Sequence, residues 1–187
     1  MKHQLLDHAE GLARTRGIDA FSFADLSDAV GIRKPSVHYH FPKKADLALA
    51  ILDRYANRVL DRLNALPDAA RAADKLRAFV QIYREASESG QKLCLCVAFS
   101  ASPNSLDARI LTRLAAFHDQ VGAWLSGVFE DARRDGSFGP IGQPEDEAAA
   151  LLSLVEGAQL MARAGEDIEK FDAAVRIFLS RAVDAKH

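Results

Sequence analysis

A short run of basic and hydrogen-bonding side chains near the N-terminus has the composition of a phosphate-binding surface. The run extends from Arg33 to Lys44 and contains no Asp or Glu, although the whole chain has a formal net charge of -2. Ser36, Tyr39 and His40 lie between the basic residues and can donate or accept hydrogen bonds. Because contact with a polyanion depends on the local surface more than on total charge, this window is suited to the phosphates and base edges of a nucleic acid.

Two helices are expected before this window. The first has one apolar stripe and ends at Gly17; the stripe consists of Leu5, Leu6, Ala9, Leu12 and Ala13. Ser22 and Asp25 have the spacing of a capping box, in which the serine hydroxyl accepts a hydrogen bond from a backbone N–H of the first turn. This spacing predicts a second, short helix from Phe23 to about Ala29.

The window itself is expected to form the second half of a helix-turn-helix. Gly31 provides a turn, and Pro35 is tolerated in the first turn of a third helix that ends at Phe41. The residues expected to face inward are Leu26, Val30, Ile32 and Val37. The opposite edge carries Lys34, Ser36, Tyr39 and His40, so that edge can enter a major groove of DNA.

The rest of the chain has the pattern of a larger helical body. An apolar stripe from Lys44 to Leu66 predicts a long fourth helix. Further helices are expected at about 69–88, 92–101, 105–134, 144–164 and 168–182, with Gly122 and Gly127 as candidate breaks in the longest. The glycine-rich segment 136–142 lacks the Lys-Ser/Thr ending of a P-loop. No strand alternation occurs, so we expect an all-α fold with about nine helices.

Several classes of protein do not fit this composition. The longest apolar stretch, Leu93 to Phe99, is far shorter than the roughly 18 residues of a membrane span, and the N-terminal segment lacks the apolar region of a secretory signal. We therefore expect a cytoplasmic protein with no membrane association. Cys94 and Cys96 are too few for a disulfide framework or a four-ligand zinc site. They are expected to be buried apolar side chains, the alternative being a redox or electrophile sensor.

An enzyme built on a helical bundle is the main competing interpretation, because such bundles hold metals with Glu-x-x-His motifs. The chain has no such motif, and its nearest approach is Asp184 three residues before His187. His38 and His40 are two positions apart on a helix, so their rings point in different directions. We expect no catalytic residues, no metal site and no cofactor.

The segment from Phe21 to Leu47 resembles the signature of the TetR family of transcriptional regulators (TetR/AcrR-like). The resemblance is dense over the first 55 or so residues and extends to the rest only in the number and lengths of the helices. It implies a helix-turn-helix DNA-binding domain at 1–45 and a helical effector-binding and dimerisation domain at 46–187. It also implies a set of DNA-contacting residues: Ser22, Arg33, Lys34, Pro35, Ser36, His38, Tyr39, His40 and Lys44.

The same resemblance implies a homodimer that binds a palindromic operator, acts as a repressor and is released by a small apolar or aromatic effector. The dimer interface would consist of Leu151, Leu154, Val155, Ala158, Met161, Phe171, Val175, Phe178 and Leu179. The effector would contact Phe79, Tyr83, Cys94, Phe99, Phe117, His118 and Trp124. An ordinary core gives the same apolar pattern, and a helical protein-interaction module without DNA binding remains the second competing interpretation.

Overall fold

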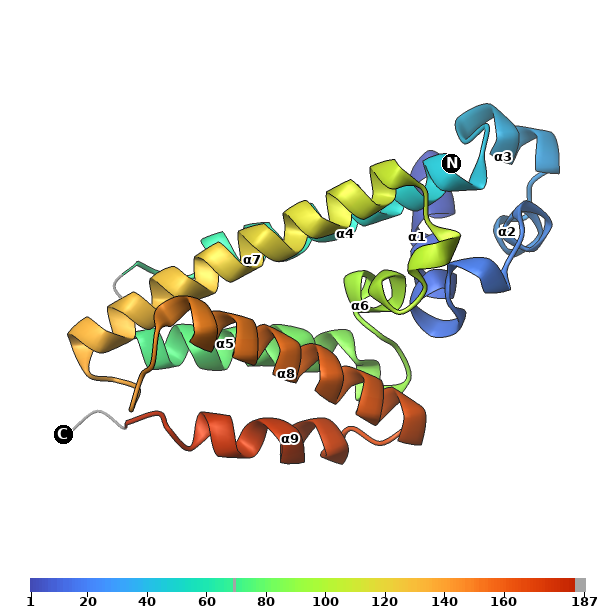
Figure 1. Ribbon diagram of the computed structural model, residues 1–187. Helices are drawn as coiled ribbons and strands as arrows, with labels where there is room; N and C mark the ends of the chain where they lie inside the picture. The colour runs from blue at the N-terminus through green and yellow to red at the C-terminus, as the bar shows by residue number, and fades with distance from the viewer. Residues whose placement is uncertain (69, 184–187) are drawn as a thin grey trace. The chain divides into compact units, whose positions relative to one another are not determined.

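The fold is all-α, as predicted. A computed structural model describes residues 1–68 and 70–183, and these residues form nine α-helices with no strand beyond an isolated bridge between Phe138 and Ala182 (Figure 1). The helices are α1 (Lys2–Arg16), α2 (Phe23–Val30), α3 (Lys34–His40), α4 (Lys44–Asn64), α5 (Ala72–Ala86), α6 (Leu95–Ser100), α7 (Ala108–Asp135), α8 (Pro144–Gly165) and α9 (Glu169–Leu179).

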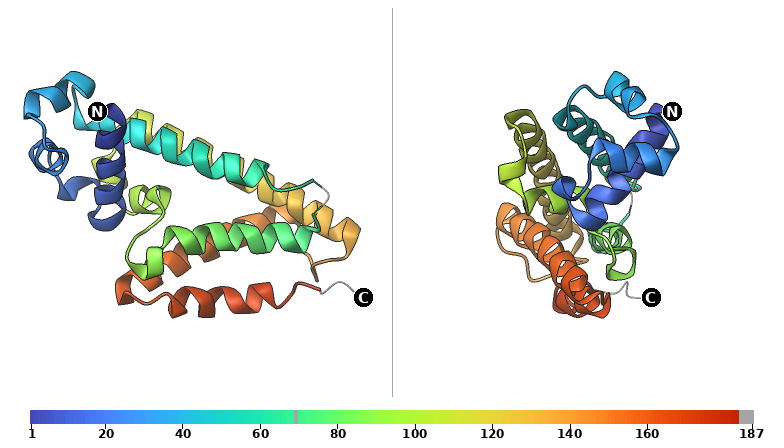
Figure 2. Two further views of the ribbon diagram at one scale, coloured as in Figure 1. Left: turned by 180° about the vertical axis from the view of Figure 1, so that it is seen from behind. Right: turned by 90° about the vertical axis from the view of Figure 1, so that its right-hand side faces the viewer.

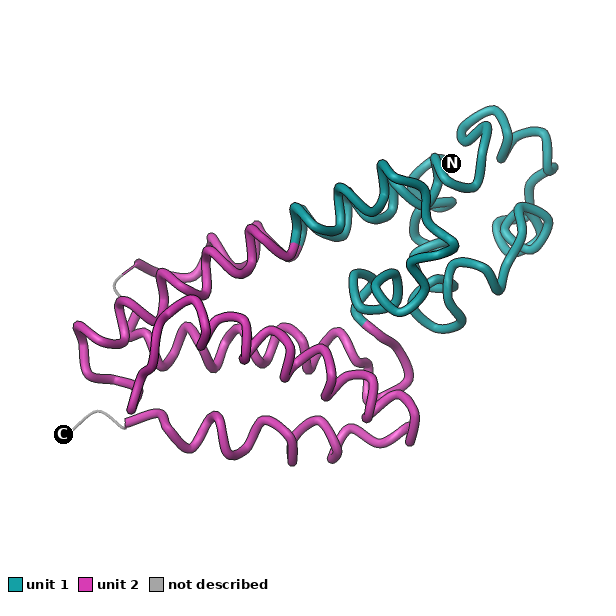
Figure 3. The backbone as a smooth tube through the Cα atoms, in the orientation of Figure 1, with its two compact units in different colours: residues 1–58, 94–117 teal, residues 59–93, 118–187 magenta. Residues whose placement is uncertain are grey.

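The chain divides into two compact units. The first comprises residues 1–58 and 94–117, and the second comprises residues 59–93 and 118–187 (Figure 3). Two long helices, α4 and α7, contribute to both units. The expected domain boundary after residue 45 therefore does not coincide with a packing boundary, and it stays a prediction about which part of the chain performs which task.

In the first unit, α1 packs against α2 and α6, and α2 packs against α3. In the predicted stripe of α1, Leu5, Leu6, Ala9 and Ala13 are buried and Leu12 is half-buried. The helix ends before Gly17, whose φ of 87° disfavours residues with a Cβ. Leu26 of α2 and Val37 of α3 are fully buried. These contacts make the first three helices one small apolar core that carries the α2–α3 turn.

In the second unit, α8 and α9 lie side by side and both contact α5 (Figure 2). Phe79 of α5 and Phe171 of α9 are fully buried. The Arg84 guanidinium of α5 donates two hydrogen bonds to the Asp172 carboxylate of α9, at 2.6 and 2.8 Å. Apolar burial thus holds this three-helix layer together, and the ion pair orients its outer edge.

Two predicted helices differ from the observed ones. The glycines at 122 and 127 do not interrupt α7, because neither has a positive φ and buried Val121 and Leu125 keep the apolar face of the helix continuous. The predicted helix at 92–101 is shorter, because Cys94 has an extended ψ of 139° and α6 begins after it.

Candidate nucleic-acid interface

Helix α2, the first helix of the helix-turn-helix, is capped as its sequence predicts. The Asp25 backbone N–H donates to the Ser22 hydroxyl at 3.3 Å, and the Ser22 backbone N–H donates to the Asp25 carboxylate at 2.7 Å. The hydrogen bonds from the Ser22 side chain and backbone lower the pKa of Asp25 below its usual range. The capping box therefore fixes where α2 begins.

The turn between α2 and α3 depends on Gly31. This residue has φ 70° and ψ 35°, a left-handed conformation that non-glycine residues rarely adopt. The Ile32 N–H then donates to the Ser27 carbonyl at 2.9 Å, which closes the end of α2. Lys34 and Pro35 follow at the first positions of α3, where a missing proline N–H leaves no hydrogen bond unmade.

One edge of α3 faces solvent along its length. Val37 is fully buried and anchors the helix, whereas Tyr39 has 84 % of its surface exposed. The other exposed members of the predicted set are Ser22, Arg33, Lys34, Pro35, Ser36 and His38. His40 is half-buried, with its ring 5.2 Å from that of Tyr39. Eight of the nine predicted DNA contacts thus belong to α3, its flanking residue or the cap of α2.

Lys44 differs from the other residues predicted to contact DNA. It is half-buried at the start of α4, and its ammonium group donates a hydrogen bond to the Phe21 carbonyl. The same ammonium lies 4.8 Å from the centre of the Phe21 ring. Lys44 therefore joins α4 to the segment before α2, a structural role that its position in the sequence did not reveal. Its neighbour Lys43 is exposed.

The residues predicted to contact an effector are divided between the two units. Phe79, Tyr83, His118 and Trp124 belong to the second unit, where the Phe79 ring lies 4.9 Å from Tyr83 and is stacked 6.1 Å from Trp124. Cys94, Phe99 and Phe117 are buried in the first unit. The prediction that these residues line an effector site stays a prediction.

Cys94 and Cys96 are both buried, as expected. Burial by itself raises the pKa of the Cys94 thiol, but hydrogen bonds with Cys96 and Tyr55 outweigh it and lower this pKa to about 7. For Tyr55, burial and the neighbouring Cys94 raise the pKa well above its usual value. These three side chains form one buried polar cluster, which sequence spacing alone did not indicate.

A surface groove of about 670 Å³ lies along α7 and α8 in the second unit. Glycine, alanine and serine residues make up much of its lining, and Asp119, Glu130 and Glu145 contribute carboxylates. Of the seven predicted effector residues, His118 alone lines this groove; its Nε2 lies 3.2 Å from the Glu156 carboxylate. The groove is therefore acidic, unlike the aromatic lining that the sequence suggested.

Most of the predicted dimer residues lie in the core of the chain itself. Six of them are buried: Leu151, Val155, Ala158, Phe171, Val175 and Phe178. Met161 is 62 % exposed, and Leu154 and Leu179 are partly exposed. These six side chains pack inside the single chain, and the assignment of the full set to a dimer interface stays a prediction. Leu160 and Ile177, which the prediction omitted, are 43 % and 80 % exposed.

Two other kinds of site, a metal centre and a membrane-spanning helix, are absent from the described residues. Among residues 1–68 and 70–183, no three His, Cys, Asp or Glu side chains gather in a way that could hold a metal ion. Asp184 and His187 lie outside the described residues. Within the described part of the chain, no helix is both long and apolar enough to span a bilayer.

Comparison with known proteins agrees with the geometry of the α2–α3 segment. A sequence model described as "Bacterial regulatory proteins, tetR family" matches residues 5–51. The regulator EthR of Mycobacterium tuberculosis is 28 % identical over 87 % of this chain and 75 % of its own length. The repressor NemR of Escherichia coli is 25 % identical over 93 % and 89 %.

A solved structure extends the similarity to the whole fold. The crystal structure of a TetR transcriptional regulator from Legionella pneumophila matches with a TM-score of 0.86 and 30 % identity, covering 98 % of this chain and 97 % of that one. Its helices thus correspond to both units and not only to the α2–α3 segment. The chain belongs to the TetR family of helix-turn-helix transcriptional regulators, and is a DNA-binding regulator and not an enzyme.

Proposed function

We propose that the protein is a repressor that binds a palindromic operator as a homodimer and leaves it when a small molecule binds. The observation that carries the proposal is the exposed edge of α3, where Tyr39 is 84 % exposed and Lys34 is also exposed, while Val37 anchors the helix in the core. A large aromatic side chain costs free energy when it is left in water, and a nucleic-acid surface would cover it.

Dimerisation would give the operator its symmetry. Leu160 and Met161 of α8 and Ile177 of α9 are exposed apolar side chains on the two neighbouring helices. Since TetR-family regulators form dimers, we assign this face to the partner. A two-fold axis between the copies would place two α3 helices on two equivalent half-sites, which is why a palindrome is expected.

DNA binding is tested by selecting sequences from a random duplex pool with the wild-type protein. A palindromic sequence should be enriched, and its affinity should fall steeply as salt rises, because Lys and Arg displace counterions from phosphates. Lys34→Ala should reduce the salt slope by about one, whereas the charge-matched control Arg77→Ala on α5 should not. Failure to enrich any sequence would contradict the proposal and favour a protein-interaction module.

The role of Tyr39 is tested by two substitutions at one position. Tyr39→Ala should weaken operator binding by about 1–3 kcal/mol and relax the sequence preference, while leaving stability unchanged because the side chain is exposed. Tyr39→Phe keeps the ring and removes the hydroxyl. If Phe restores binding, the ring contacts the DNA by packing; if it does not, the hydroxyl is the contacting group.

Release by an effector is tested through Trp124, the single tryptophan of the chain. We place the effector beside the ring cluster of Phe79, Tyr83 and Trp124, because aromatic walls suit a small apolar ligand. A compound that lowers operator affinity should then also change the Trp124 fluorescence. A releasing compound that leaves the fluorescence unchanged would place the effector site elsewhere.

A further inference from the structure

A buried carboxylate joins α1 to α4. Within the described residues, Glu10 is the only charged residue that is buried, with 7 % of its surface exposed. It lies on the inward side of α1, one position after buried Ala9. We call helices α1–α3 the headpiece. Because an unpaired buried charge is strongly destabilising, the headpiece can fold with Glu10 buried only if the partners of Glu10 are held in place.

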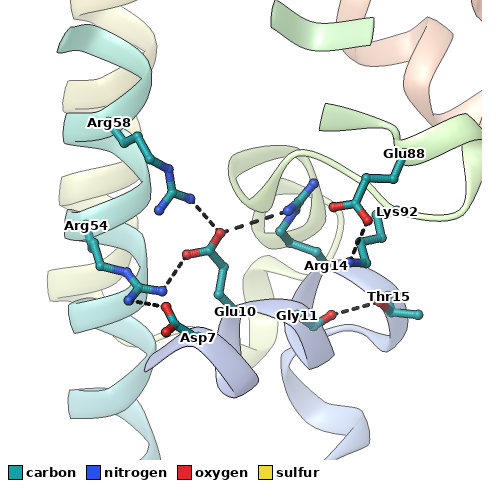
Figure 4. A network of polar contacts seen from close by, with 9 residues as sticks. All are labelled: Asp7, Glu10, Gly11, Arg14, Thr15, Arg54, Arg58, Glu88 and Lys92. Carbon is teal, nitrogen blue, oxygen red and sulfur yellow. Dashed lines mark hydrogen bonds and ion pairs between the residues drawn. The ribbon is translucent and has the colours of Figure 1, made fainter. Parts of the chain in front are cut away.

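Three arginines surround this carboxylate. One oxygen of Glu10 accepts a hydrogen bond from Arg58 at 2.6 Å and lies 3.9 Å from Arg14; the other accepts from Arg54 at 2.8 Å (Figure 4). Arg54 also donates to Asp7 at 2.7 Å. Arg54 and Arg58 are one turn apart on α4, so the network connects α1 to two successive turns of that helix.

Two of these three arginines are also packed against a buried ring. The guanidinium groups of Arg14 and Arg58 lie 5.6 and 5.1 Å from the centre of the Tyr55 ring, which is 5 % exposed. The carboxylate and the ring therefore restrict both guanidinium groups at once. If Glu10 lost its charge, the three guanidinium groups would repel one another. The other acid of the network, Asp7, could not replace Glu10, because its side chain is 67 % exposed and water weakens its attraction.

Apolar contacts alone would let α1 rotate and shift on α4 more than the hydrogen-bonded network of Glu10 does. Leu5, Leu6 and Ala9 bury α1 in the core, but apolar contact has no direction and tolerates small rotations and shifts. Hydrogen bonds of 2.6 and 2.8 Å to two turns of α4 have a required geometry. They therefore set the angle between α1 and α4; α2 follows through its packing on α1, and α3 through its packing on α2.

We propose that Glu10 is a positioning residue for operator binding, which fixes the orientation of the α1–α3 headpiece on α4 through Arg54 and Arg58. The inference rests on the proposed binding of a palindromic operator by a dimer. A dimer must present two α3 helices at a set separation, so a headpiece that can tilt on α4 loses affinity for the full operator. Contact between one headpiece and one half-site does not depend on that separation.

The test uses the full-length protein and an operator selected by the wild type. Glu10→Gln removes the charge and keeps the shape of the side chain. Asp53→Asn is the matched control, because Asp53 precedes Arg54 on α4 and pairs with Arg113 of α7 at 2.7 Å instead of with α1. Operator dissociation constants are measured for the palindrome, for a single half-site, and for palindromes with one base pair added or removed between half-sites.

Glu10→Gln should raise the dissociation constant for the palindrome about tenfold or more, broaden the preference for half-site spacing, and change half-site binding by less than about twofold. Asp53→Asn should stay within about twofold in every assay. Should Glu10→Gln fail to fold, Arg58→Gln gives the same test, because the Arg58 side chain is 49 % exposed and contributes one of the two short bonds.

Equal losses on the palindrome and the half-site, in proportion to lost thermal stability, would show that Glu10 acts on stability alone and would overturn the inference. Unchanged operator binding in Glu10→Gln and in Arg58→Gln would overturn the inference as well. If the wild type itself selects no palindrome, the proposed function is wrong, and the inference is wrong with it.

Discussion

Replacing Lys44 by alanine is expected to destabilise the protein as well as weaken DNA binding. The Lys44 ammonium donates to the Phe21 carbonyl and lies 4.8 Å from the centre of the Phe21 ring, so the substitution removes two contacts between α4 and the segment before α2. Lys43→Ala is the matched control, because Lys43 has the same charge at the preceding position and is exposed.

The size of the effect follows from the two contacts. A hydrogen bond involving a charged group contributes about 1.5–3 kcal/mol, and half-burial of Lys44 favours the lower end. A cation–π contact at a partly exposed site adds about 0.5–1 kcal/mol. Their loss should lower the free energy of unfolding by about 2 kcal/mol, which is about a 30-fold change in the folding equilibrium. Lys43→Ala should stay within about 0.5 kcal/mol.

Urea unfolding of the wild type, Lys44→Ala and Lys43→Ala measures the difference in free energy of unfolding. Operator titrations at several salt concentrations test separately whether Lys44 contacts DNA. If Lys44 also contacts phosphate, its substitution should reduce the slope of log affinity against log salt by about one. The structural reasoning is refuted if Lys44→Ala loses less than about 0.5 kcal/mol of stability, whatever happens to DNA binding.

Three further predictions concern the core, the pH dependence and the thiols. Leu26→Ala should cost about 2–5 kcal/mol in urea unfolding, because Leu26 is fully buried under the helix-turn-helix; a smaller loss would mean that the headpiece core collapses around the cavity. The Arg181 guanidinium lowers the pKa of Glu147 in the folded protein. The pair therefore stabilises the fold fully at pH values above the pKa of an unfolded glutamate, about 4.3. This contribution is lost as the pH falls through the lower pKa of Glu147 in the folded state. Glu147→Gln should remove that part of the acid sensitivity in unfolding measurements between neutral and acid pH, and an unchanged pH profile would contradict the assignment. Cys94 is only 3 % exposed, so alkylation by iodoacetamide in native buffer should be slow until urea unfolds the protein; rapid labelling would show that the thiol is reached from solvent.

Local sequence signals were sufficient for the helix-turn-helix. Ser22 caps α2, Gly31 forms the turn after it, and Pro35 lies in the first turn of α3, as the sequence predicted. Each of these signals acts over three or four residues, through one hydrogen bond or one backbone angle. The exposed edge of α3 followed from the same short-range geometry, since Val37 faces inward and Tyr39 outward.

Contacts between distant residues were not predictable in this way. The first N–H groups of α5 are capped by Asp135 at 2.8 Å and by Ser137 at 2.9 Å, more than 60 residues further along the chain. Glu10 offered a weak signal, an acid beside buried Ala9 on the inward side of a helix, but nothing in the sequence identified Arg54 and Arg58 as its partners.

The family, the helical fold and the edge of α3 that faces solvent could all be predicted from the sequence, because motifs, periodicity, caps and turns are local properties of the chain. The packing of the helices was needed to show that Phe171 and Val175 belong to the core while Ile177 remains exposed. Both faces of α9 carry apolar side chains, and which of them is buried depends on the helices that pack against it. The same dependence on packing gave Lys44 its internal partner and Glu10 its arginines.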